Sequence, residues 1–219
     1  MTRGKAYFTG SLEKRQHGVI FGIGVSFLLS ALFLSTITYK IPFNFRDVCI
    51  SNIGNPNHNP QSYLIFTFVC IFAGILLSGH QMYIYKNLKH ISKIPAKIGL
   101  FLSLLGDVGL ILVGIVNETY FPEHFILAGF AFGGMGLAIF VSVFMLMWDI
   151  YKRRDKDLIP IFSTSMIFLA VCSSIILREF SIYGVNVASD LFFTEWIAFF
   201  LVMGWQIILY LLPDLKKAE

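Results

Sequence analysis

The fold is decided by apolar segments such as residues 62–85, which read SYLIFTFVCIFAGILLSGHQMYIY and contain no Asp, Glu, Lys or Arg. A helix of about 20 apolar residues crosses the hydrocarbon core of a bilayer. An open sheet would leave its backbone polar groups unsatisfied in lipid, and a barrel would alternate polar and apolar residues. This segment is therefore predicted to be a transmembrane helix.

Five more segments have the same character, and together they account for most of the chain. Of the 219 residues, 56% are hydrophobic and only 14% are charged. A soluble domain has about 45–50% apolar and about 25% charged residues. We therefore predict an all-α, polytopic membrane protein with a single six-helix transmembrane domain over residues 1–219. The predicted spans are residues 18–39, 62–85, 97–116, 125–148, 158–177 and 195–212.

The basic residues orient these spans. Of 17 Lys and Arg residues, only Lys40, Arg46 and Arg178 fall on one predicted side of the membrane. Lys and Arg accumulate in cytoplasmic loops, so both termini are predicted to be cytoplasmic. The net charge of +4 thus reflects topology and contact with anionic lipid headgroups, and no nucleic-acid partner is expected. Nothing distinguishes a plasma membrane from an endomembrane or sets the oligomeric state, and a membrane-protein partner stays possible.

Three polar residues lie inside predicted spans: His80, Asp107 and Gln206. A charge within the bilayer is costly, so Asp107 is either a proton or cation site, a contact for a headgroup, or a buried structural carboxylate. His80 lies at a similar depth on the preceding span, and a His80–Asp107 pair is possible. Gln206 is interpreted as a structural bond between helices. His80 is the only histidine in a predicted span, which disfavours a bis-histidine haem.

The outer side carries most of the remaining polar candidates. His124 precedes the fourth predicted span, and Glu195 opens the sixth, where a helix dipole would favour a carboxylate. His124 with Glu118, Glu123 or Glu195 could form an acid–base pair. No spacing typical of a metal site, nucleophile elbow or phosphate-binding loop occurs, so neither metal nor cofactor is expected. The outer polar residues are Asp47, Ser51, Asn52, His58, Glu118, Glu123, His124, Arg178, Glu179, Asp190 and Glu195.

Small residues suggest where helices approach closely. Small residues of the first and fourth spans permit close helix contacts in membranes. They are Gly18 and Gly22 with Gly24, and Gly129 and Gly133 with Gly134 and Gly136. The three cysteines offer no pair in the loops, so no disulfide framework is implied.

The sequence ISNIGNP at residues 50–56, with its serine, glycine and proline in the first outer loop, resembles the Frag1/DRAM/Sfk1 group and the related DUF998 membrane proteins. His124 at the mouth of the fourth span and Glu195-Trp196 at the start of the sixth extend the resemblance. Asn52 departs from the group, which often has an acid at this position. The resemblance implies a multi-pass protein tied to membrane lipids. It also implies an outer-leaflet site formed by Ser51, Gly54, His124, Glu195 and Trp196.

These observations lead to one principal hypothesis and two alternatives. The principal hypothesis is a protein that binds or handles a lipid at the outer-leaflet side of the bundle. An alternative is a lipid acyltransferase or hydrolase in which His124 and Glu195 are catalytic, and another is a transporter centred on Asp107. The ligand-binding candidates are Arg46, Ser51, Asn52, Gly54, His58, Glu123, His124, Glu195 and Trp196.

Overall fold

The computed structural model describes residues 2–40, 42–153 and 187–211, together with residues 159, 162, 163 and 166. For residues 153 and 187–192 only the backbone is described. Within these residues the chain is helical and contains no strand, which confirms the all-α class for this part. The elements are α1 (Arg3–Phe8), α2 (Lys14–Ile37), the 3-10 helix η1 (Ser51–Gly54), α3 (Tyr63–Leu88), α4 (Lys93–Ile115), α5 (Glu123–Arg153) and α7 (Val187–Tyr210).

Five helices of the described chain are long and apolar enough to cross a membrane: α2, α3, α4, α5 and α7. They correspond to five of the six predicted spans, with ends displaced by a few residues. The predicted fifth span, residues 158–177, lies outside the described residues apart from four isolated positions. The short helix α1 falls in the basic segment before the first span, where no helix was predicted.

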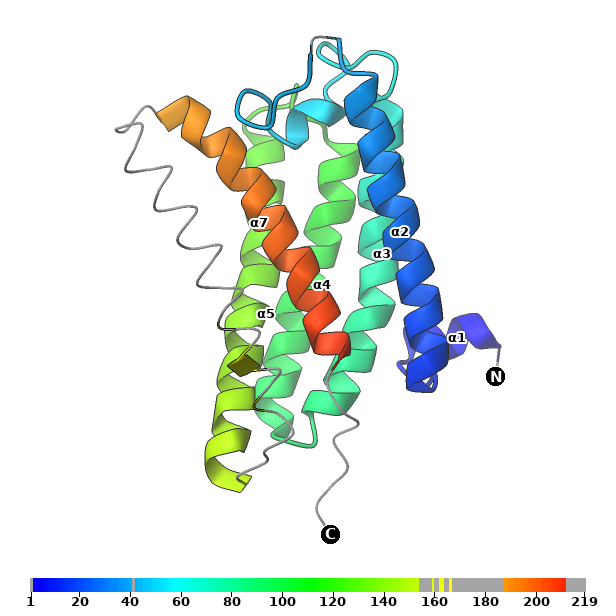
Figure 1. The fold of residues 1–219 in the computed structure, drawn as a ribbon, viewed down its shortest axis with the longest axis vertical. Coiled ribbons are helices and arrows are strands. Elements are labelled where there is room, and N and C mark those ends of the chain that lie inside the picture. Colours follow the sequence, from blue (N-terminus) through cyan, green and yellow to red (C-terminus); the bar gives the residue numbers. More distant parts are fainter. Residues whose placement is uncertain are drawn as a thin grey trace.

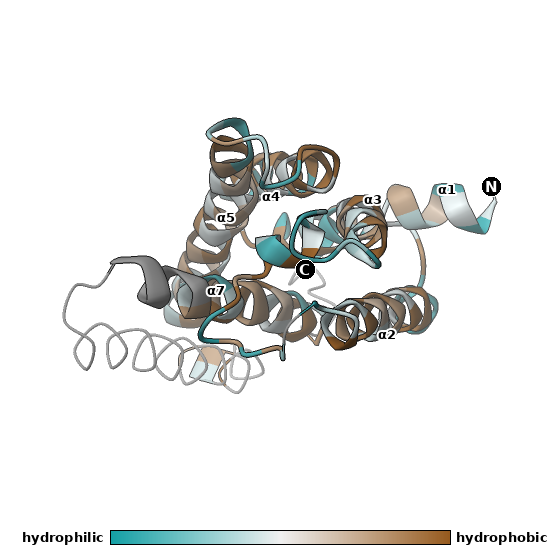
Figure 2. Cartoon of the chain, turned by 90° about the horizontal axis from the view of Figure 1, so that it is seen from above, coloured by the Kyte–Doolittle hydropathy of each residue, from teal (hydrophilic) through white to brown (hydrophobic). Residues whose placement is uncertain are grey.

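The long helices form a bundle in which α4 packs between α3 and α5, while α2 packs on α3 and α7 on α5 (Figures 1 and 2). The end of the bundle that carries η1 is called the outer end, and the opposite end the inner end. At the inner end the Tyr210 hydroxyl donates to the Lys14 carbonyl at 3.2 Å, and Lys86 Nζ donates to Ser11 Oγ at 2.8 Å. The start of α2, the end of α3 and the end of α7 therefore meet.

The outward faces of the bundle are apolar. Phe68 on α3 is 70% exposed and Phe140 on α5 is 72% exposed, and many other large apolar side chains are also exposed. Such a surface would be unfavourable in water but suits contact with lipid tails. The hydropathy colouring of the long helices in Figure 2 shows the same property.

Glycines bring α4 and α5 together, and Gly134 is the one among those predicted in the fourth span that does so. A Cβ at Gly109 would lie 2.6 Å from the Ala131 nitrogen, and one at Gly134 would lie 2.8 Å from the Gly106 nitrogen. Among the described residues no atom lies within 4 Å of a Cβ placed at Gly129 or Gly133, so the predicted close contact is not found at these two glycines in this part of the chain. Both glycines lie on a different face of α5 from Gly134.

The loop between α2 and α3 is fastened to the outer end by Asn59, which is fully buried. Its Nδ2 donates to the carbonyls of Ser35 and Ile53, both at 3.1 Å. Ser35 is near the end of α2 and Ile53 is within η1, so one amide links the helix to the loop. The link holds η1 over the middle of the bundle, as the view from above shows (Figure 2).

Replacing Gly109 by alanine is expected to destabilise the bundle by about 1–3 kcal/mol, because its methyl group would meet the backbone of α5. Equilibrium unfolding of the purified protein in mixed detergent micelles measures this change. The matched control is Gly133→Ala, which is expected to be neutral or stabilising by up to about 1 kcal/mol, since alanine favours helix over glycine. Equal effects of the two substitutions would contradict the packing described here.

Candidate functional site

An apolar cavity occupies the outer half of the bundle beneath η1. It encloses about 840 Å³ of empty space, including the open space at its mouth. Its walls come from α2, α3, α4, α5 and α7, and the polar residues that line it are Ser51 and Glu195. The apolar lining comprises Leu28, Leu29, Leu32, Ile50, Phe66, Val69, Cys70, Ala73, Leu77, Leu110, Val113, Ala128, Ala131, Phe132, Met135, Phe199, Val202 and Met203.

Ser51 and Glu195, two of the predicted site residues, are in contact. The backbone nitrogen and the hydroxyl of Ser51 both donate to Glu195 Oε2, each at 3.4 Å. Ser51 is buried and Glu195 is half-buried. Helix α7 begins at Val187, more than two turns before Glu195, so the prediction that Glu195 is a charge at the helix start is wrong. The carboxylate instead meets η1 beside an apolar cavity.

Asn52, the next residue of η1, belongs to a polar cluster with Glu118, from the α4–α5 connection. Its Nδ2 lies 3.3 Å from His58 Nδ1, and Asn55 Nδ2 donates to Glu118 Oε2 at 3.4 Å. With the Asn52 amide turned over, its nitrogen donates to both Glu118 oxygens, at 3.1 and 3.0 Å. Glu118 was predicted as a possible partner of His124, but its contacts are with the asparagines of the first outer loop.

Trp196 and Gly54 fix the position of η1 and the loop before it. Trp196 is buried, and its Nε1 donates to the Val48 carbonyl at 2.8 Å. Its ring packs edge-on against Phe45, with 4.9 Å between ring centroids. A side chain at Gly54 would collide with the ring of Phe66. Both residues therefore shape the cavity mouth without lining the cavity.

The other ligand-binding candidates lie away from the cavity wall. Arg46, His58 and Glu123 are exposed at the outer end, and none of them lines the cavity. Arg178, Glu179 and the side chain of Asp190, which were also predicted on this side, fall outside the described residues.

His124 is buried at the start of α5 and does not form the predicted pair with an acid. Its Nδ1 lies 2.6 Å from the Val116 carbonyl, so this nitrogen carries the proton and donates. Its Nε2 has no hydrogen-bond partner, and His124 does not line the apolar cavity. The bond from His124 to the Val116 carbonyl links the start of α5 to the end of α4. Among the described residues, no carboxylate is bonded to either ring nitrogen of His124, although the acid–base hypothesis requires such a bond.

Cys49 lies immediately before η1 and contacts both polar residues that follow it. Its Sγ is 3.1 Å from Ser51 Oγ and also contacts the Asn52 side-chain oxygen. The pKa of the Cys49 thiol is raised to about 12. Burial is the largest cause, and the negative charge of Glu195 is the second. Burial and the negative charges of the same cluster also raise the pKa of Tyr39.

A second polar cluster, which the sequence analysis missed, lies at the inner end. His17 Nε2 and His80 Nδ1 are 3.0 Å apart, and His80 Nε2 lies 3.1 Å from the Gln206 carbonyl. Because a carbonyl only accepts, His80 Nε2 carries a proton, and in the neutral ring its Nδ1 accepts from His17 Nε2. His17 Nδ1 is then left as an unpartnered acceptor. Both histidines are fully buried.

Aromatic rings enclose this histidine pair. His17 stacks on Tyr83 with 4.1 Å between centroids and on Tyr7 of α1 with 4.9 Å, while His80 stacks on Phe21 with 3.9 Å. The Tyr7 hydroxyl donates to the Leu76 carbonyl at 2.8 Å, which joins α1 to α3. His17 lies within α2, which is long and apolar enough to span a membrane, so the prediction that His80 is the only histidine in a span is wrong.

The predicted His80–Asp107 bond is not formed, because both nitrogens of His80 have other partners. Asp107 is 1% exposed, and neither of its carboxyl oxygens has a hydrogen-bond partner. The Asp107 backbone carbonyl lies against α3 at Gly74, where a Cβ would be 2.6 Å away. Asp107 is thus buried inside the bundle between the two ends.

Compared with family models, curated proteins and solved structures, the chain matches none of them. The functional argument therefore rests on the contacts and cavities of this chain.

The histidine pair is expected to contribute a coupling energy of roughly 1 kcal/mol between α2 and α3, as a buried neutral hydrogen bond does. The measurement is a double-mutant cycle of His17→Phe and His80→Phe, with unfolding in mixed micelles as the readout. The double variant should be more stable than the sum of the single changes predicts. Additive effects would rule out a direct bond. His58→Ala, in the exposed loop, is the control.

Cys49 is expected to resist alkylation in the folded protein, because a thiol whose pKa is raised to about 12 stays protonated across neutral pH. In a Cys70→Ser, Cys172→Ser background, iodoacetamide labelling followed by mass spectrometry should be slow at pH 8 and complete after unfolding. Glu195→Gln removes a negative charge near the thiol and should accelerate labelling at pH 8. Rapid labelling of the folded parent at pH 7 would contradict the buried environment.

Proposed function

We propose that this protein binds a membrane lipid at the outer end of the bundle, with an acyl chain in the apolar cavity and the headgroup at Ser51 and Glu195. The observation that carries the proposal is the cavity itself, whose lining is apolar apart from these two residues. Ligand pockets are commonly apolar with a few polar groups that orient the ligand. An acyl chain has the shape and chemistry that such walls accommodate.

The polar mouth favours a headgroup that donates hydrogen bonds. The Glu195 carboxylate only accepts, and its present donors in Ser51 are at the long distance of 3.4 Å. A lipid hydroxyl or amine could therefore compete for it. Arg46 lies exposed in the same loop region and suits a phosphate, since a guanidinium binds phosphate oxygens in pairs.

The proposal includes the six-span topology with both termini cytoplasmic and a relationship to the Frag1/DRAM/Sfk1 group. The meeting of α2, α3 and α7 at the inner end agrees with the topology, because the segments concerned are those rich in Lys and Arg. The proximity of Ser51, Gly54, Glu195 and Trp196 at one mouth supports the relationship. A lipid acyltransferase or hydrolase that uses His124 is less well supported, because no acid is bonded to His124.

Filling the cavity tests the proposal. Native mass spectrometry of the protein extracted from its membrane is expected to show a retained lipid, and Ala128→Phe should abolish retention by placing a ring in the cavity. The matched control is Gly129→Phe, because Gly129 is the neighbouring residue and has open space beside it. Glu195→Gln should weaken retention several-fold and change which headgroups are retained.

If the Ala128→Phe variant retains the lipid as well as the Gly129→Phe variant does, binding in the cavity is contradicted. A retained lipid that is lost equally from both variants would indicate a nonspecific annular lipid. Circular dichroism and gel-filtration profiles that match those of the parent establish that each variant is folded.

A further inference from the structure

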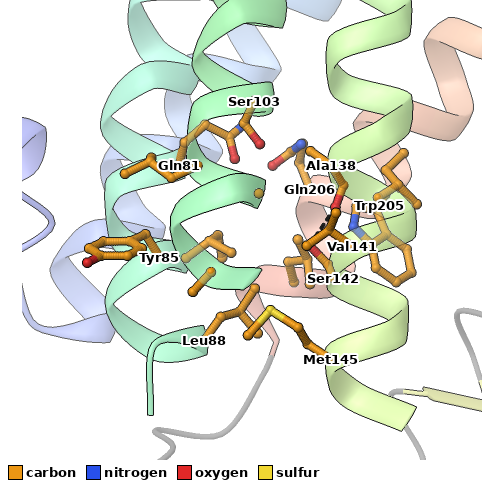
Figure 3. Close-up of a pocket in the computed structure, with 16 residues that line it drawn as sticks. Gln81, Tyr85, Leu88, Ser103, Ala138, Val141, Ser142, Met145, Trp205 and Gln206 are labelled. Atoms are coloured by element: carbon orange, nitrogen blue, oxygen red, sulfur yellow. Dashed lines mark hydrogen bonds between the residues drawn. The ribbon is translucent and has the colours of Figure 1, made fainter. Parts of the chain in front are cut away.

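The inner half of the bundle contains a second pocket, between α3, α4, α5 and α7, with about 360 Å³ of empty space including its opening. Unlike the outer cavity, it has several polar side chains in its wall. Figure 3 shows Gln81 of α3 and Ser103 of α4 directed into the pocket from one side, and Gln206 of α7 from the other.

Three polar atoms of this wall are buried and have no hydrogen-bond partner among the residues that the structure describes. They are the donors Gln81 Nε2 and Trp205 Nε1 and the acceptor Gln206 Oε1, on side chains at most 3% exposed. Buried polar groups are nearly always bonded, to protein or to an ordered water. A water molecule donates and accepts, so it complements this mixed set, and the pocket is large enough to hold one.

Asp107 lies one helical turn from Ser103, on the same side of α4. The next turn brings Leu110, which lines the outer apolar cavity. Asp107 therefore lies at a depth between the outer cavity and the inner pocket, and its side chain is part of the wall of neither. An ionised carboxylate without a partner is strongly unfavourable in this setting, whereas the protonated carboxyl is neutral.

The titratable groups around Asp107 leave no direct acceptor for its proton in the described chain. Tyr7 of α1 interacts with it electrostatically, and burial and the Asp107 charge raise the pKa of the phenol, so Tyr7 stays neutral. On α3, both nitrogens of His80 are occupied, by His17 of α2 and by the Gln206 carbonyl of α7. On α5, the groups that face this part of α4 are Ala131 and Met135, which do not titrate.

We propose that Asp107 is a proton-binding site that exchanges its proton through water held in the inner pocket. On release the O–H bond of the carboxyl breaks, and the proton joins a pocket water to give hydronium, which leaves toward the inner end. Uptake is the reverse. Gln81, Trp205 and Gln206 act by holding the water and do not themselves gain or lose protons. This site is separate from the lipid site proposed above.

The test is infrared spectroscopy of the full-length protein in lipid nanodiscs, in H₂O and after transfer to D₂O. The parent is expected to show a protonated-carboxyl C=O band that disappears in Asp107→Asn and shifts in frequency in Asp107→Glu. The band should shift on transfer to D₂O. Gln81→Leu and Gln206→Leu should keep the band and slow its shift at least tenfold. Ser142→Ala is the matched pocket control, because that hydroxyl already donates to the Ala138 carbonyl, and its exchange rate should equal that of the parent.

Three results would overturn the proposal. The absence of a band assigned to Asp107 would mean that the carboxyl is ionised and bound to a cation. A band that does not shift over the measurement would mean that Asp107 is sealed and structural. A shift that is equally fast in the Gln81→Leu and Gln206→Leu variants would exclude the inner pocket as the route. The Ala128→Phe variant separates the two proposals, because it should lose the lipid and retain the exchanging band.

Discussion

At Gly106, Gly109 and Gly134 the backbones of α4 and α5 approach so closely that a methyl group does not fit between them. Lipid tails are as apolar as the helix surfaces, so burying apolar area gives little reason for helices to associate in a membrane. Close packing and hydrogen bonds must do so instead. The contact at these glycines fixes the rotation of α4, which turns Ser103 and Asp107 toward the interior. The positions of both pockets follow from that rotation.

The interior is divided by polarity along its length. The outer cavity is lined by aliphatic and aromatic side chains, and the polar residues of its lining are Ser51 of η1 and Glu195 of α7. The inner half has glutamine, serine and tryptophan side chains between the same helices, with the histidine pair beside them. A polar side chain within a bundle must find its partner there, because lipid offers none. Three of the four ring nitrogens of the histidine pair meet this requirement, through each other and a backbone carbonyl. Among the described residues, His17 Nδ1 and atoms of Gln81, Gln206 and Asp107 have no partner.

The sequence predicted which segments form helices better than it predicted which face of each helix points into the bundle. Span positions follow from the length and composition of apolar runs, and five of them correspond to observed helices. Depth alone suggested Asp107 as the partner of His80, but rotation about the helix axis decides contacts, and His17 is the actual partner. His17 was missed because it precedes the apolar run, among charged residues. His17, Phe21, Val25, Leu28 and Leu32 recur every three or four residues and are all buried, and this helical periodicity was the signal that could have placed His17 on the inward face. The site at Ser51 and Glu195 came from a family resemblance, since no periodicity links residues so far apart in the chain.

Glu195 and Asp107 show why position within the bundle determines what an acid can do. Glu195 lies at the outer cavity mouth, where the backbone and hydroxyl donors of Ser51 reach it. Its charge can be compensated, so it can remain an acceptor for a ligand. Asp107 lies in the middle of the bundle with no donor within reach, so its charge has no compensation unless a proton or cation supplies it. The same functional group is therefore suited to recognition at one depth and to proton exchange at the other, and the glycine contact that sets the rotation of α4 maintains this difference.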